Sequence, residues 1–133
     1  MRNVICLGFL SAALVVAGVT SADDGAEKQA KSSSVWMKKK LDYSEEILAG
    51  IAVADFDRVS AAAGQMRTLN KVESFARARN PAYRDQLKAF QEANEEILRR
   101  AEAKDVDGAA SAFSSLTTSC IRCHKVLRDQ TAK

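Results

Sequence analysis

Residues 106–127 read VDGAASAFSSLTTSCIRCHKVL, and this stretch decides what the rest of the chain can be. Its apolar and small residues recur every three or four positions, which is the period of one face of an α-helix. Asp105 directly precedes the stretch and is a favourable N-cap residue. The sequence therefore predicts a long amphipathic helix that begins after Asp105 and buries Val106, Ala109, Phe113, Leu116, Cys120, Cys123 and Leu127.

Within this helix, Cys120-Ile121-Arg122-Cys123-His124 has the C-x-x-C-H spacing that attaches a c-type haem. Thiols at positions i and i+3 lie on one helical face, so each can add to one vinyl group of the same porphyrin. The histidine that follows can then bind the iron axially. The motif predicts one covalent haem c, attached through Cys120 and Cys123, with His124 as an iron ligand.

Other uses of a C-x-x-C pair suit this chain less well. A thioredoxin-like redox pair needs a βαβ setting. A zinc site needs four ligands, and the only Cys or His outside the motif is Cys6, near the N-terminus. A disulfide between i and i+3 cysteines of one helix has poor geometry. The chain's single histidine, placed directly after the pair, favours haem attachment.

Residues 1–22 are typical of a secretory signal peptide. Arg2 supplies a positive charge, residues 4–19 are uncharged and largely apolar, and the Thr-Ser-Ala of residues 20–22 suits cleavage before Asp23. A retained membrane anchor is the alternative, but the apolar run is short for a bilayer span and no basic residue follows it closely. We expect export to the periplasm and no stable membrane anchor after cleavage.

The remainder is long enough for one small domain. Residues 23–33 are polar and lack an apolar period, so they are expected to form a flexible lead. Residues 34–131 are expected to form the domain, because every long segment has the helical period and none alternates at period two. Expected helix starts are Val35 after Ser34, Phe56 after Asp55, Pro81 after Asn80, and Val106 after Asp105.

Each of the first three helices has an expected interior face. These faces are Met37, Leu41, Ser44, Leu48 and Ile51; Phe56, Val59, Ala63, Met66, Leu69, Val72 and Ala76; and Tyr83, Leu87, Phe90, Asn94, Ile97 and Ala101. Short connections make neighbouring helices antiparallel, so the predicted fold class is all-α, an antiparallel up-down-up-down four-helix bundle. Gly64, inside the second helix, would admit either a flat ligand or a close helix crossing.

Four helices, a C-x-x-C-H motif in the last one and Arg128 four residues after His124 resemble the cytochrome c-prime family. The resemblance covers nearly all of the chain after the signal peptide, with one departure at Leu127, where many members have an aromatic residue. Some members of that family have an open distal face, and in others a methionine of the first helix binds the iron. Met37 stands where that ligand would be. Homodimers are frequent in the family, but no surface stripe of this sequence requires one.

The expected topology also favours Met37. The first helix begins, and the last one ends, at the same pole of such a bundle, and at 1.5 Å per residue Met37 and His124 each lie within ~10 Å of it. Met66 would lie deeper, at ~15 Å. Met37 is therefore interpreted as the second axial ligand, with simple core filling as the alternative. Arg128 would contact a haem propionate or remain at the solvated end of its helix.

These features predict an electron carrier with a His/Met-ligated iron and a redox partner protein. The alternative is a five-coordinate protein that binds nitric oxide or carbon monoxide. Enzyme activity is not expected, because no second histidine is available to act as the acid–base of a peroxidase. A net charge of +3 is too small to indicate nucleic-acid binding. The run Lys38-Lys39-Lys40 is interpreted as a solvated face, with steering of an acidic partner as the alternative.

Overall fold

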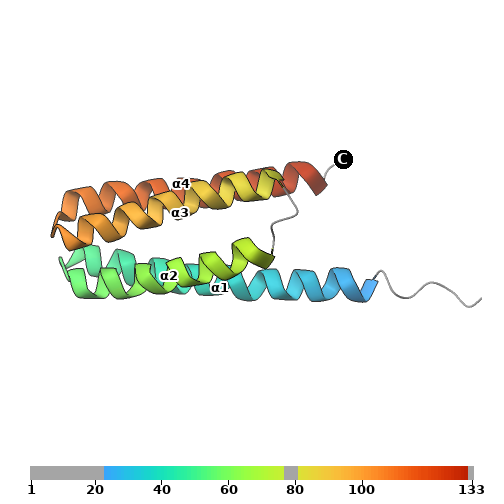
Figure 1. The fold of residues 1–133 in the computed structure, drawn as a ribbon, viewed down its shortest axis with the longest axis horizontal. Helices are drawn as coiled ribbons and strands as arrows, with labels where there is room; N and C mark the ends of the chain where they lie inside the picture. The colour runs from blue at the N-terminus through green and yellow to red at the C-terminus, as the bar shows by residue number, and fades with distance from the viewer. Residues whose placement is uncertain (1–22, 77–80, 132–133) are drawn as a thin grey trace, which may run out of the picture.

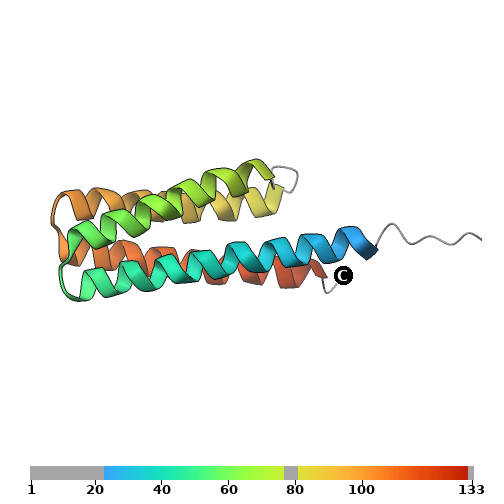
Figure 2. The same ribbon diagram turned by 90° about the horizontal axis from the view of Figure 1, so that it is seen from below.

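The computed structural model describes residues 23–76 and 81–131, so the predicted signal peptide and Asn80 lie outside the described residues. The regular structure within these ranges is four helices: α1 (Asp23–Ala52), α2 (Phe56–Ala76), α3 (Pro81–Glu102) and α4 (Val106–Thr131). They pack lengthwise as a bundle (Figures 1 and 2), in which α3 and α4 make the most extensive interface and α1 and α4 the least extensive. The predicted all-helical class is confirmed.

Two turns with the same backbone conformation join α1 to α2 and α3 to α4 at the same end of the bundle (Figure 1). The residue before each aspartate, Ala54 or Lys104, has a positive φ, 54° and 51° respectively. In the first turn the N–H of Asp55 donates to the carbonyl of Gly50 at 2.9 Å, and the N–H of Asp105 makes the equivalent 2.9 Å bond in the second. This is the closing bond of a Schellman motif, which satisfies carbonyls at a helix end.

The same two aspartates begin the next helices. Asp55 Oδ1 accepts a hydrogen bond from the N–H of Arg58 at 3.0 Å, and Asp105 Oδ1 accepts one from the N–H of Gly108 at 2.9 Å. The bond from Gly108, together with the Arg100 guanidinium, lowers the pKa of Asp105 below its ordinary value. Both predicted N-caps are confirmed.

The start of α1 differs from the expectation. The helix begins at Asp23, so the predicted start at Val35 was wrong, and residues 23–33, expected to be a flexible lead, are helical. This segment has no apolar period, but it is rich in Ala, Glu, Lys and Gln, which have high helix propensity, and it has two acidic residues in its first turn. In both views the N-terminal part of α1 extends beyond the other helices (Figures 1 and 2).

The interior face of α3 is as predicted. All six of its expected residues are buried: Tyr83, Leu87, Phe90, Asn94, Ile97 and Ala101. The amide of Asn94 donates to the carbonyl of Ala63 in α2 at 2.9 Å, which links the two helices inside the core. Other core residues are Val59 and Met66 of α2 and Ala109 and Leu116 of α4. The expected face of α4 was wrong at its first position, since Val106 is exposed.

The interior face of α1 is rotated from the predicted one. Ile47 is fully buried, whereas Leu41 and Leu48 are 62% and 53% exposed. Counting back from Ile51 and Ile47 in steps of three and four places Ser44, Lys40 and Met37 on the buried side. The prediction placed Leu41 and Leu48 on the interior face because they are apolar. The spacing of three and four residues instead puts Met37, Lys40, Ser44 and Ile47 on one face of the helix.

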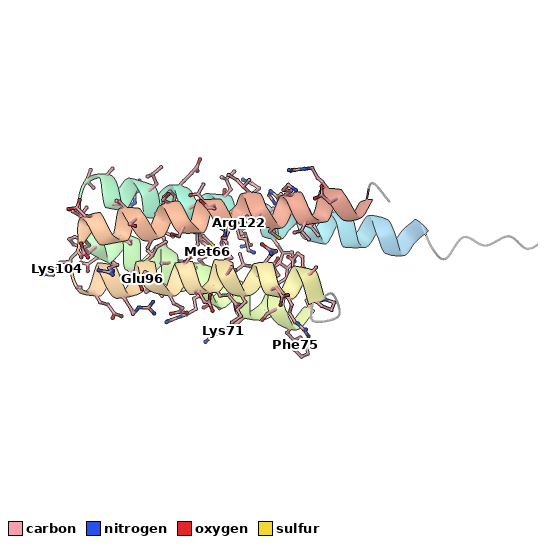
Figure 3. All side chains as sticks on the ribbon, turned by 90° about the horizontal axis from the view of Figure 1, so that it is seen from above. Met66, Lys71, Phe75, Glu96, Lys104 and Arg122 are labelled. Carbon is pink, nitrogen blue, oxygen red and sulfur yellow. The ribbon has the colours of Figure 1, made fainter. Side chains whose placement is uncertain are left out.

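The second half of α2 differs in the same way. Val72 is 55% exposed and Ala76 is also exposed, while Asn70 and Glu73 are each 1% exposed. These two polar residues continue the spacing of Met66, which lies between the helices in Figure 3, while Phe75 projects from the surface. The interior face of the C-terminal half of α2 is therefore polar. A prediction based on the spacing of apolar residues could not detect it.

We expect Gly64→Ala to stabilise the protein. A Cβ atom at Gly64 would have no non-local heavy atom within 4 Å, so no close helix crossing requires glycine there. Alanine should raise the free energy of unfolding by ~0.5–1 kcal/mol, measured by denaturant unfolding. Gly50→Ala is the opposing control, because its Cβ would lie 2.8 Å from Cγ2 of Val59 and should destabilise the turn. A loss of stability in Gly64→Ala would contradict this account.

Candidate functional site

A cavity of about 560 Å³ opens between α1, α3 and α4. Met37 of α1 lines it together with Cys120, Cys123 and His124 of α4, and much of the α3 wall is formed by Leu87 and Phe90. Its volume lies within the range of small-molecule and cofactor sites, and predominantly apolar walls with few polar groups are typical of such sites. Two helices far apart in the sequence, α1 and α4, thus bring four chemically distinctive side chains to one cavity, and α3 supplies an apolar wall.

The motif residues reach this cavity because of the register of α4. Leu116, 1% exposed, fixes the buried face of the helix, and Cys120 and Cys123 follow at spacings of four and three residues. Both cysteines are half-buried thiols, not a disulfide. His124 also lines the cavity, although the residue is exposed to solvent. The spacing that attachment chemistry requires is therefore present on the cavity wall.

Met37 is half-buried on the interior side of α1 and lines the same cavity. Its helix continues through Ile47 and Ile51 into the bundle core, which fixes the side of α1 that faces α4. Met66, by contrast, is fully buried in that core and does not line the cavity. Of these two methionines, the structure brings Met37 to the motif.

Lys40 also lines the cavity, and the sequence interpretation missed it. Its side chain is only 12% exposed, and its Nζ lies 2.5 Å from Oε2 of the buried Glu73 in α2. The hydroxyl of Tyr83 in α3 donates to the other oxygen of Glu73, and Lys40 Nζ lies 4.5 Å from the centre of the Phe90 ring. The interpretation of the lysine run as a solvated face was wrong for Lys40, although Lys38 and Lys39 are exposed.

The positive charge of Lys40 acts on the Cys120 thiol of α4. Burial raises the pKa of the Cys120 thiol, and the Lys40 ammonium acts in the opposite direction by favouring the thiolate. A lysine of α1 and a cysteine of α4 are therefore electrostatically coupled through the space between their helices. Any group bound in this cavity would experience the same positive charge.

The residues present fit a haem c. Two thiols with i, i+3 spacing can form the two thioethers, an imidazole follows directly, and a thioether sulfur is available from the opposite helix. Leu87 and Phe90 supply apolar surface suited to a porphyrin face. This donor set suits a haem iron, for which the porphyrin itself supplies four ligands.

Two further side chains do not line this cavity. Arg128 is exposed on α4, one helical turn after His124. Trp36 lines a separate groove of about 320 Å³ between α1 and α2, with Tyr43 and Leu69. The cavity is therefore defined by α1, α3 and α4 without these two side chains.

The described residues contain neither a separate metal-binding cluster nor a membrane-spanning helix. Across 23–76 and 81–131, no three or more His, Cys, Asp or Glu side chains gather in a way that could hold a metal ion. None of the helices described is both long and apolar enough to cross a bilayer.

Comparison of the chain with protein-family models, with curated proteins and with solved structures gave no match. Its function must therefore be inferred from the motif and from the cavity that surrounds it.

Proposed function

We propose that this protein is an exported c-type cytochrome that carries one covalent haem and transfers single electrons. Cys120 and Cys123 form the thioethers, and His124 and Met37 bind the iron from α4 and α1. The fold that places them is an antiparallel up-down-up-down bundle, in which the beginning of α1 and the end of α4 share one end. The function is that of an electron carrier without enzymatic activity.

One observation carries the proposal: a single cavity is lined by Met37 of α1 and by Cys120, Cys123 and His124 of α4. The C-x-x-C-H motif alone supports attachment and one axial ligand. The cavity adds a thioether sulfur from another helix, which is the ligand that distinguishes an electron carrier from an open gas-binding site.

The haem would supply the one-electron couple of its iron. The chain's own residues hold and enclose it. The two cysteines would fix its position on α4, the imidazole of His124 and the sulfur of Met37 would bind its iron, and Phe90 and Leu87 would exclude water. A thioether ligand favours the ferrous state and raises the potential relative to ligation by histidine alone.

The location and partner follow from the same features. The predicted signal peptide, residues 1–22, supports a periplasmic location, where a redox partner protein would exchange electrons with the haem. The exposed Lys38, which lines the cavity, and its exposed neighbour Lys39 would favour an acidic partner surface. Arg128 at the end of α4 is a further candidate contact for a haem propionate.

The decisive experiment is a visible absorption spectrum of the full chain expressed with a c-type maturation system. We expect a covalent haem with low-spin ferric and ferrous spectra, because two axial ligands give a strong ligand field. Carbon monoxide should then change the ferrous spectrum slowly or incompletely. A protein without covalent haem would overturn the proposal at its base.

A high-spin ferric spectrum with ready binding of carbon monoxide would favour the alternative, a five-coordinate protein that binds nitric oxide or carbon monoxide. In that case Met37 would be a wall residue of an open distal pocket, and its half-buried position would control access of the gas. The two functions thus give different spectra for the same attached haem.

A further inference from the structure

The cluster formed by Lys40, Glu73 and Tyr83 is the most unusual feature of the core. Glu73 is 1% exposed, its two oxygens contact Lys40 and Tyr83, and the three side chains come from three different helices. Buried ion pairs cost desolvation free energy and contribute little stability compared with apolar residues of similar size. Stability alone therefore does not explain a polar cluster of this kind beside the cavity, and a functional role is the alternative.

We propose that this cluster holds the positive charge of Lys40 at the cavity wall and thereby raises the reduction potential of the haem. The inference rests on the proposed haem function. Lys40 lines the cavity, whereas its counter-ion Glu73 does not, so the cation belongs to the member of the pair that is nearer to a bound group. Glu73 and Tyr83 act as positioning residues.

The direction of the expected shift in reduction potential follows from electrostatics. Ferric haem carries one more positive charge than ferrous haem, so a neighbouring cation destabilises the ferric state and raises the potential. The low exposure of the pair limits screening by solvent, and the Phe90 ring over which Nζ lies restricts the ammonium further. The effect of Lys40 on the pKa of Cys120 supports a field that reaches the α4 side of the cavity. Lys40 contacts Glu73 of α2, and the other ionisable residues that line its cavity are Lys38, Tyr83, Cys120, Cys123 and His124.

The test compares reduction potentials of holoprotein variants. Lys40→Met should lower the potential, because the cation at the wall is lost. Glu73→Gln should raise it, because the same cation is no longer compensated. Lys39→Met is the matched control: it removes the same charge from the adjacent exposed position and should change the potential less than either variant.

Opposite shifts distinguish a charge effect from looser packing, because admitting water to the haem would change the potential of both variants in the same direction. Shifts no larger than that of Lys39→Met, or shifts of the same sign in both variants, would overturn the inference. Tyr83→Phe should move the potential towards that of Glu73→Gln, because a phenyl ring no longer holds the carboxylate in place.

The experiment separates this inference from the proposed function. A wild-type protein without covalent haem contradicts the function itself. A wild-type haem protein whose potential is insensitive to Lys40 and Glu73 leaves the function intact and removes only the role of the cluster.

Discussion

Replacing both motif cysteines, Cys120→Ala with Cys123→Ala, should abolish covalent haem attachment completely. Each thioether requires its own thiol, and the two thiols line the same cavity. Each single variant should retain at most one link to the porphyrin. The measurement is the protein mass after extraction with acidified organic solvent, which removes haem that is not covalently bound. We expect the haem mass increment to remain in the wild type and to be absent from the double variant.

Ser119→Ala is the matched control, because Ser119 also lines the cavity from α4 but has no role in attachment. It should keep the full haem mass increment. The double variant should also melt at a lower temperature than the wild type, since a group bound only by the folded state stabilises it. A double variant that keeps its haem through extraction, or a wild type that loses it, would contradict the proposed attachment.

The ends of the helices could be predicted wherever a local signal determines them. Asp55 and Asp105 each hydrogen-bond a backbone N–H three residues later, and such caps depend on neighbours in sequence alone. Pro81 begins α3 for the same kind of local reason. The N-terminal extension of α1 could not be found from the apolar period, because its sequence has no such period and only helix propensity and the acidic residues of its first turn favour a helix there.

The interior faces were predictable only where hydrophobic residues and helical geometry agree. On α3 they agree throughout, from Tyr83 to Ala101. On α1 they disagree, because Leu41 and Leu48 are exposed while Lys40 is nearly buried. A lysine enters the interior because a glutamate of another helix neutralises it, and a pairing between α1 and α2 leaves no trace in the local pattern of either helix.

The residues of the candidate site also fall into two groups, those that local spacing predicts and those that depend on helix packing. The motif predicts the chemistry of Cys120, Cys123 and His124 by spacing alone, and the cavity brings Met37 to them as expected. The buried contacts of Lys40 and Glu73 depend on the relative rotation of three helices, which the motif does not determine. Local spacing therefore identifies the groups proposed to hold a cofactor, and tertiary packing determines the charges that surround the cavity.

The proposed electron-carrier function depends most directly on Met37→Ala. Loss of the thioether should open the sixth coordination position, convert ferric iron towards high spin and lower the reduction potential, because methionine favours ferrous haem. Ferrous iron should then bind carbon monoxide readily. The measurements are the ferric and ferrous spectra, with attention to a sulfur-to-iron charge-transfer band at the red end of the ferric spectrum, and a redox titration.

Met66→Ala is the control that separates ligation from packing. Met66 is fully buried in the core and does not line the cavity, so its loss should cost ~2–5 kcal/mol of stability and leave the spectra unchanged. Met37 is only half-buried, so its replacement should cost less stability but change every spectroscopic property of the iron. If the wild type lacks the charge-transfer band and Met37→Ala leaves the spectrum as it was, the iron is not bound by Met37. The cavity would then be an open distal pocket, and binding of nitric oxide or carbon monoxide would replace electron transfer as the function that the fold supports.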